Sequence, residues 1–167
     1  RMKMTRILRA GQRFLTSADY RFIYMANLGR YNTMPDEEYL RRMFKAVMGT
    51  ELDLEHPVTF NEKLQWLKLY DRNPLYTTIV DKYEVKYIIP TLGVWDNPDE
   101  IDFEKLPNQF VLKCNHNSGL GMCICKDKSK LNYDKVRADL RKGLAQDYYL
   151  LNREWPYKDV PRKIIAE

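Results

Sequence analysis

The chain has 167 residues, of which 44% are hydrophobic and 31% charged, a composition typical of a folded globular protein. It contains no apolar run close to the roughly 20 residues that a membrane-spanning helix needs. Seven of its 28 basic residues lie within residues 1–30, opposed there by Asp19 alone, so the rest of the chain has no basic excess and nucleic-acid binding over its whole surface is disfavoured.

A basic amphipathic helix is predicted over residues 6–25. At about 100° per residue, the apolar side chains gather on one face, and Arg6, Arg9 and Arg13 fall on the other. Two interpretations stay open, because such a helix can bind an anionic membrane surface or pack on its own domain. The apolar face consists of Ile7, Leu8, Phe14, Leu15, Ala18, Phe22 and Met25.

Further helices are predicted before residue 90. Pro35 opens one whose first turn is acidic, as the helix dipole prefers, and Gly49 ends it. Thr59 and Glu62 have the spacing of a capping box at the start of the next. Pro74 ends that helix and starts another through residue 87. Side chains at helical spacing predict a packed face on the third helix: Phe60, Leu64, Leu67 and Tyr70.

Beyond Pro90 the pattern changes to short β-rich runs. Residues 91–95 and 109–116 are bounded by Pro, Gly, Asn and Asp, as strands commonly are, and residues 122–126 follow a glycine-containing loop. A helix then begins, and residues 161–167 end the chain as a strand. Asn132 is the predicted cap of that helix, with Val136, Leu140, Leu144 and Tyr148 on one face. The predicted fold class is α+β.

Lys113 lies within an otherwise apolar strand, where a buried ammonium group is costly unless an anion meets it. The loop that follows, residues 117–121, contains two glycines, which let backbone N–H groups approach an anion closely. Together they predict a phosphate-binding site. A glycine hairpin turn beside a snorkelling lysine explains the same residues. The spacings of a P-loop and of a dinucleotide-binding loop are both absent, so a different type of nucleotide site is required.

Three cysteines, Cys114, Cys123 and Cys125, lie close together in the sequence. Their odd number argues against a secreted disulfide framework and favours a reducing cytoplasm. With His116 they offer four ligands for a structural zinc ion, although the C-x-C spacing is tighter than zinc sites usually have. The N-terminal residues lack the uninterrupted apolar stretch of a signal peptide.

Four stretches of the chain closely resemble the TupA-like branch of the ATP-grasp proteins, named for teichuronopeptide biosynthesis. They are TFNEKLQWLKLYDRNPLYTTIVDKYEVK, LPNQFVLKCNHNSG, ICKDKSKLN and REWPYKDVPRKIIAE. Members occur among bacterial cell-surface and capsular polysaccharide genes and are often labelled glycosyltransferases. The resemblance implies a helical N-terminal segment over residues 1–54, then an ATP-grasp-like nucleotide-binding region over 55–167 that is truncated at its hinge strand.

The resemblance also implies a set of nucleotide-binding residues between two α+β subdomains. Lys82 and Lys113 match the two lysines that contact the phosphates of ATP. The loop after Lys113 matches the mobile loop that covers the phosphates, and the last strand matches the hinge that touches adenine. The loop residues are Asn117, Ser118, Gly119 and Gly121, and the hinge residues are Ile165, Ala166 and Glu167.

The chemistry implied by the resemblance is phosphorylation of a carboxylate by ATP, followed by attack of an amine. Because the family's Mg²⁺ ligands follow the hinge, they are expected beyond Glu167, and this chain alone is expected to be inactive. The complete protein is expected to act as a ligase on cell-surface polysaccharide or its precursors, in the cytoplasm or peripherally at the inner face of the membrane through residues 1–30. Two alternatives stay open: a sugar-nucleotide glycosyltransferase, whose usual Asp-x-Asp motif is absent, and a non-catalytic nucleotide-binding module of a polysaccharide assembly system.

Overall fold

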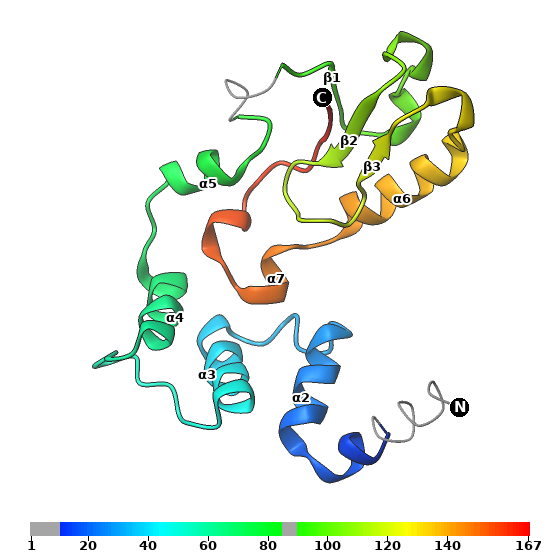
Figure 1. Cartoon of the computed structure of the whole chain (residues 1–167). Helices are drawn as coiled ribbons and strands as arrows, with labels where there is room; N and C mark the ends of the chain where they lie inside the picture. Colours follow the sequence, from blue (N-terminus) through cyan, green and yellow to red (C-terminus); the bar gives the residue numbers. More distant parts are fainter. Residues whose placement is uncertain (1–10, 85–89) are drawn as a thin grey trace. The chain divides into compact units, whose positions relative to one another are not determined.

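The described residues of the computed structural model, 11–84 and 90–167, form a series of helices and one four-stranded sheet (Figure 1). The chain is therefore α+β, which confirms the predicted fold class. It divides into two units, which we call the helical unit and the sheet unit. The helical unit comprises Arg1–Asp71 and Leu150–Glu154, and the sheet unit comprises Arg72–Tyr149 and Trp155–Glu167.

The N-terminal helix predicted over residues 6–25 is interrupted at Ser17. Residues 11–16 are helical, and α2 (Ala18–Asn27) then begins anew, because the Ser17 hydroxyl accepts a hydrogen bond from the Tyr20 N–H at 3.1 Å as an N-cap. Phe22 and Ala26 of α2 pack against the core of the helical unit. Residues 6–10 of the prediction lie outside the described residues.

Three of the helix ends predicted in the helical unit are confirmed. α3 (Asp36–Met48) follows Pro35 and ends at Gly49, whose φ of 75° is a left-handed conformation that glycine adopts without strain. α4 (Phe60–Tyr70) begins with a capping box, in which the Thr59 hydroxyl accepts from the Glu62 N–H at 3.2 Å and the Glu62 carboxylate accepts from the Thr59 N–H at 2.8 Å.

The core of the helical unit is built from α3 and the segment after it. It contains Tyr39, Leu40, Phe44, Leu52 and Leu54. The packed face predicted for α4 is wrong, because none of its residues is buried and Phe60 is 75% exposed. Of this helix, Leu69 contacts the core instead.

Arg153 ties the segment after α7 (Tyr149–Asn152) into the helical unit. Its guanidinium group donates to the Asp36 carboxylate at 3.0 Å and to the Tyr31 carbonyl at 2.9 Å, and it lies over the Tyr39 ring at 4.6 Å. The side chain is only 3% exposed. A buried cation is stable there because an ion pair, a carbonyl and an aromatic face replace its water.

The sheet unit begins with α5 (Leu75–Val80), which follows Pro74. The prediction that this helix continues through residue 87 is wrong from Asp81, which has extended backbone torsions and is followed by a turn at residues 82–84. Residues 85–87 of the prediction lie outside the described residues. The buried Asp81 carboxylate accepts the Tyr83 N–H at 2.8 Å, the kind of side-chain contact that favours a turn over a helix.

The four strands are antiparallel and lie in the order β1-β4-β2-β3. Their bounds are Gly93–Trp95 for β1, Phe110–Cys114 for β2, Cys123–Cys125 for β3 and Ile164–Ala166 for β4. The register places Lys113 opposite Ile165 of β4 and Val111 opposite Ile124 of β3. The strand that ends the sequence is therefore a central one.

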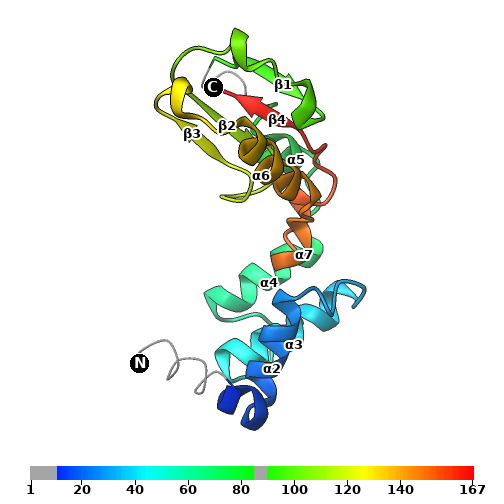
Figure 2. The same ribbon diagram turned by 90° about the vertical axis from the view of Figure 1, so that its right-hand side faces the viewer.

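Helix α6 (Tyr133–Ala145) covers one face of this sheet (Figure 2). Asn132 caps it by accepting the Lys135 N–H at 2.9 Å, as predicted. Val136 and Leu140 join the core that the sheet contributes. Residues alternate along β2, so Phe110, Leu112 and Cys114 are buried while Val111 and Lys113 are half-buried. Other members of this core are Ile101, Phe103, Leu106, Cys125, Ile164 and Ala166.

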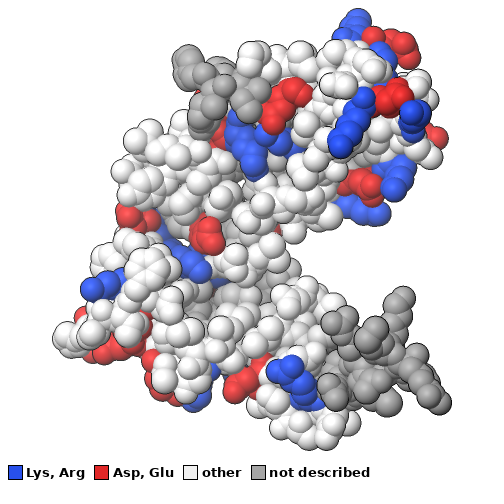
Figure 3. Space-filling model, in the orientation of Figure 1, with Lys and Arg blue, Asp and Glu red and all other residues white. Residues whose placement is uncertain are grey.

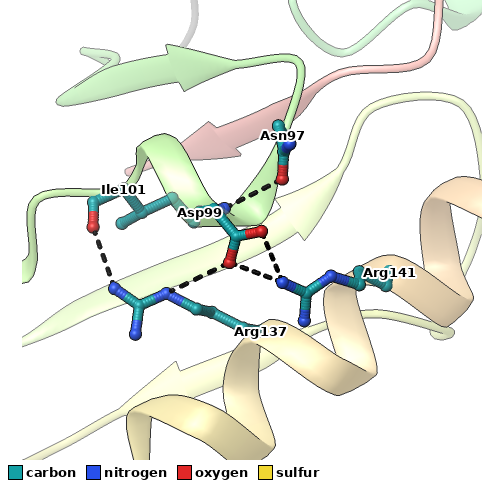
Figure 4. Close-up of polar contacts among 5 residues, drawn as sticks. All are labelled: Asn97, Asp99, Ile101, Arg137 and Arg141. Carbon is teal, nitrogen blue, oxygen red and sulfur yellow. Dashed lines mark hydrogen bonds and ion pairs between the residues drawn. The ribbon is translucent and has the colours of Figure 1, made fainter.

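Short 3₁₀ turns lie between other elements of the sheet unit, and ionic contacts with α6 hold the first of them, η1 (Pro98–Glu100), in place (Figure 4). Asp99 pairs with Arg141 of α6 at 2.6 Å, and Arg137 donates to the Ile101 carbonyl at 3.4 Å. The Lys128 ammonium group donates to three backbone carbonyls at 2.9–3.2 Å. The turns are η1 (Pro98–Glu100), η2 (Phe103–Lys105), η3 (Lys128–Lys130) and η4 (Trp155–Tyr157).

Candidate functional site

The end of β2 is joined to two other segments by the side chain of Asn115. Its amide nitrogen donates to the Asp81 carboxylate at 2.8 Å and to the Pro161 carbonyl at 2.7 Å, and its oxygen accepts the Lys163 N–H at 2.7 Å. Asn115 is fully buried and Asp81 nearly so. The joint thus fixes the segment that carries Lys82 against the end of β2 and the start of β4.

Lys82 projects from the turn after α5 to the start of the glycine-rich loop. Its ammonium group donates to the Asn115 carbonyl at 3.1 Å and also to the Asn117 carbonyl. Burial lowers the pKa of Lys82 below its ordinary value, and the positive charge of Lys113 lowers that pKa further. Two ammonium groups from separate parts of the sequence are therefore brought close enough to repel each other.

Lys113 lies on the face of β2 that turns away from α6. Its ammonium group pairs with the Glu167 carboxylate, and the two side chains are 22% and 19% exposed. The Glu167 backbone is held by Val111, which donates to its carbonyl at 2.7 Å and accepts its N–H at 3.0 Å. A lysine in this strand is tolerated because a carboxylate meets it, which is the role that the sequence suggested for an anion.

The glycine-rich loop has an exposed tip between two buried ends. Asn117 and Gly121 are buried, whereas residues 118–120 are exposed. Gly119 and Gly121 have φ values of 86° and 70°, which most other residues adopt only with strain. The two glycines thus allow a tight bend whose tip can reach solvent.

The buried ends of the loop are fastened to the C-terminal part of α6. The Asn117 amide donates to the Gly143 carbonyl at 3.1 Å, and His116 Nε2 lies 3.0 Å from the Gln146 carbonyl. A carbonyl only accepts, so Nε2 carries the proton and Nδ1 is left as a buried atom without a hydrogen-bond partner. Burial lowers the pKa of His116, which favours this neutral form. The Gly143 carbonyl accepts two hydrogen bonds, one from the Asn117 amide and one from the Gln146 N–H at 3.2 Å, which ends the helix.

The remaining hinge residues are placed differently from Glu167. Ile165 and Ala166 are 3% and 0% exposed, and β1 and β2 flank their strand on both sides. The Ala166 carbonyl already accepts the Leu92 N–H at 2.7 Å. The structure thus brings together Lys82, Lys113, Glu167 and the loop, but it leaves Ile165 and Ala166 inside the sheet, and their contact with adenine stays a prediction.

The described residues do not offer a site for a metal ion. No three His, Cys, Asp or Glu side chains within 11–84 and 90–167 lie close enough to hold one. The zinc alternative is therefore wrong, because Cys114 faces α6 while His116 turns to Gln146. Asp81 and Glu167, the carboxylates beside the lysines, are already bonded to Asn115 and Lys113. The residues present thus do not fit Mg²⁺.

Charge is mixed over the surface around this site. On the face drawn in Figure 3, basic and acidic side chains of the described residues lie in small groups of both signs, separated by uncharged areas. Beside the loop the positive charge is a local pair, because Lys82 donates to the Asn117 carbonyl and the charge of Lys113 lowers the pKa of Lys82. Such a pair selects small anions rather than a long polyanion.

These features define a class of protein: α+β, with a glycine-rich loop between two antiparallel strands, a lysine on the first strand and a second lysine brought to the loop from a preceding turn. The model of one family, TupA-like ATP-grasp, matches residues 62–167. The chain belongs to that family. No significant match was found to a curated protein or to a solved structure.

Several residues that build the site were not predicted as part of it. Asp81, Asn115 and Gly143 act through contacts with residues 26 to 48 positions away in the sequence. Asp81 directly precedes Lys82, and Asn115 lies within the stretch LPNQFVLKCNHNSG that resembles the family. Their place in these stretches is a signal that could have found them. Gly143, a lone glycine inside a predicted helix, is the other such signal, because glycine is unfavourable there unless packing requires it.

Proposed function

We propose that the sheet unit binds ATP and that this chain contributes the nucleotide site of an ATP-dependent carboxylate–amine ligase. The observation that carries the proposal is the convergence of Lys82 and Lys113 at the glycine-rich loop. In the free chain the carboxylates of Glu167 and Asp81 offset these two ammonium groups, and a polyphosphate that takes the place of Glu167 can pair with both lysines. Membership of an ATP-grasp family supports the choice of nucleotide.

Each lysine is held by a group that a phosphate oxygen can replace. Lys113 has one carboxylate partner, and Lys82 has backbone carbonyls. Phosphate oxygens carry more charge than a carbonyl, so exchange of these partners for phosphate is favourable for the ammonium groups. With ATP bound, Glu167 is released toward the part of the nucleotide next to the phosphates.

The outer face of β2 and β3 offers a surface for the base. A groove of about 440 Å³ runs over Val111 and Ile124 and reaches Glu167. Ile124 is 61% exposed, and Lys113 lies on the same face of β2 as Val111. A flat purine can cover these apolar side chains while its phosphates reach the lysines.

The residues then have distinct roles in the proposed reaction. Lys82 and Lys113 hold and neutralise the phosphate oxygens, and the loop tip covers them and excludes water. When bound, ATP supplies the phosphoryl group that activates a carboxylate. The resemblance supports a cell-surface or capsular polysaccharide, or its precursor, as the acceptor.

The test is calorimetric titration of the purified chain with ATP. Lys113→Met should weaken binding by about tenfold to a hundredfold, because a hydrogen bond to a charged group is worth about 1.5–3 kcal/mol. Lys105→Met is the matched control, since Lys105 is 84% exposed and its ion pair among the described residues is with Asp102, three positions away. Equal ATP affinity in the Lys113 variant would reject the site. Binding of a sugar nucleotide without binding of ATP would favour a glycosyltransferase instead.

We also propose that the protein works in the cytoplasm, with residues 1–30 in peripheral contact with an anionic membrane. The three cysteines are free, as a reducing compartment requires. Leu15 is 78% exposed on a basic segment, whereas Phe22 packs on α3. None of the helices in the described part of the chain is long and apolar enough to cross a membrane. Sedimentation with anionic vesicles should be salt-sensitive, and no binding at low salt would leave packing as the role of this segment.

A further inference from the structure

We propose that Gly143 of α6 is a positioning residue for the glycine-rich loop, which rests on it and is hinged there. The proposal concerns how this helix sets the loop, and its functional part rests on the ATP site proposed above. Two observations motivate it. Gly143 lies inside a helix, where glycine is unfavourable, and it directly contacts Gly121 of the loop.

The contact between the two glycines leaves no room for a side chain. A Cβ atom on Gly143 would lie 2.8 Å from the Gly121 Cα, 2.7 Å from the Cys114 sulfur and 2.9 Å from the Leu120 carbonyl oxygen. Two of these three atoms belong to the loop backbone, which cannot give way by a simple side-chain rotation. A Cβ on Gly121 would meet Gly143 in the same way at 2.8 Å. The loop therefore packs this closely against α6 only because α6 has a glycine at this position.

Gly143 holds the other end of the loop as well. Its carbonyl accepts the Asn117 amide at 3.1 Å, so one residue of α6 is in contact with both buried ends. His116 adds a second bond, to the Gln146 carbonyl. Between these fixed ends only residues 118–120 are exposed.

The consequence is a loop whose movement is confined to a short tip. The backbone carbonyl of Asn117 also accepts the Lys82 ammonium group, so the height of the loop over α6 sets where this lysine meets it. A loop raised from α6 would move the Asn117 carbonyl away from the Lys82 ammonium group. It would also move the backbone N–H groups of the loop away from the phosphates that Lys82 binds. Gly143 would then influence phosphate binding without touching the nucleotide.

The first test is amide hydrogen exchange over residues 117–121 in Gly143→Ala. Exchange there should become about tenfold faster, the equivalent of about 1.4 kcal/mol, because the added methyl group overpacks the contact and lifts the loop. Gly11→Ala is the matched control, since Gly11 is also helical and a Cβ there would meet nothing within 4 Å. Asn117→Ala, which removes the hydrogen bond without adding atoms, should accelerate exchange at the same residues.

The second test compares nucleotides. Gly143→Ala should weaken the affinity for ATP by about tenfold. Its affinity for adenosine, which has no phosphates, should stay within about twofold of that of the unmodified chain. Unchanged amide exchange at residues 117–121 in both Gly143→Ala and Asn117→Ala would overturn the inference. Faster exchange spread evenly over β2 and α6 would also overturn it, because it would show a general loss of stability. Faster loop exchange in a protein that binds no ATP would uphold the positioning role and overturn the proposed function.

Discussion

Replacing Asn115 by Asp changes one atom of the joint between Asp81, Pro161 and Lys163. The side chain keeps its shape, and its first oxygen can still accept the Lys163 N–H, which now lies at 2.7 Å. The second oxygen takes the place of an amide that donates to Asp81 at 2.8 Å and to the Pro161 carbonyl at 2.7 Å. Two hydrogen bonds are thereby replaced by contacts between acceptors.

The magnitude follows from burial. Asn115 is fully buried, so neither the new carboxylate nor the Pro161 carbonyl can turn to water. Each unsatisfied buried group costs about 1–3 kcal/mol, so the two groups together give a loss of about 2–6 kcal/mol at neutral pH. Nearby Lys82 reduces the repulsion between the carboxylates but cannot donate in place of the lost amide. This is a large share of the roughly 5–15 kcal/mol that domains possess.

The variant should also have a distinctive pH dependence. A proton shared by the two facing carboxyl groups restores one donor, so the folded variant binds a proton that its unfolded chain releases above about pH 4. Its stability should therefore fall as pH rises and recover by about 1–2 kcal/mol between pH 7 and pH 5 relative to the unmodified chain. Urea unfolding at several pH values measures this. A variant as stable as the unmodified chain at pH 7, or one whose deficit does not change with pH, would refute the reasoning.

Two further predictions concern buried groups of the other kinds. Burial raises the pKa of the Cys114 thiol from 9.0 to about 11, so this residue contributes stability that is complete below about pH 9 and lost as pH rises toward 11, by at most about 2–3 kcal/mol. The difference in free energy of unfolding between the unmodified chain and Cys114→Ala should narrow between about pH 9 and about pH 11 in urea titrations. Parallel pH profiles of the two proteins would contradict the raised pKa of Cys114. Arg153→Met removes the hydrogen bonds of Arg153 to Asp36 and to the Tyr31 carbonyl and should cost about 2–4 kcal/mol. Lys45→Met, which breaks an exposed pair with Glu51, should shift the urea midpoint far less. Equal shifts would show that the buried contacts of Arg153 do not stabilise the helical unit more than an exposed ion pair does.

What the sequence predicted well is what neighbouring residues determine. The capping box of Thr59, the Asn132 cap and the glycine that ends α3 depend on residues at most three or four positions apart, and all are present. Alternation along β2 was enough to separate Lys113 from the buried residues of the same strand.

What it predicted poorly depends on partners far along the chain. The apolar spacing of α4 indicates a packed face, but nothing in the spacing says whether another element covers it, and Phe60 is exposed. The helix expected through residue 87 ends at Val80, because Asp81 turns to Asn115 in another part of the sheet unit. The contact of Gly121 with Gly143 requires knowledge that α6 crosses behind the loop, which no local pattern contains.

The segment Leu150–Glu154 belongs to the helical unit although the chain on both sides of it belongs to the sheet unit. The boundaries suggested by the family match, residues 62–167, would therefore cut through a folded body. A protein expressed from residue 62 onward keeps Arg153 but discards Asp36, Tyr31 and Tyr39, and so removes three of the groups that hold its buried guanidinium group. Deletions and exchanges between relatives should treat residues 11–71 and 150–154 as one inseparable set, so that two separate stretches of coding sequence are inherited together.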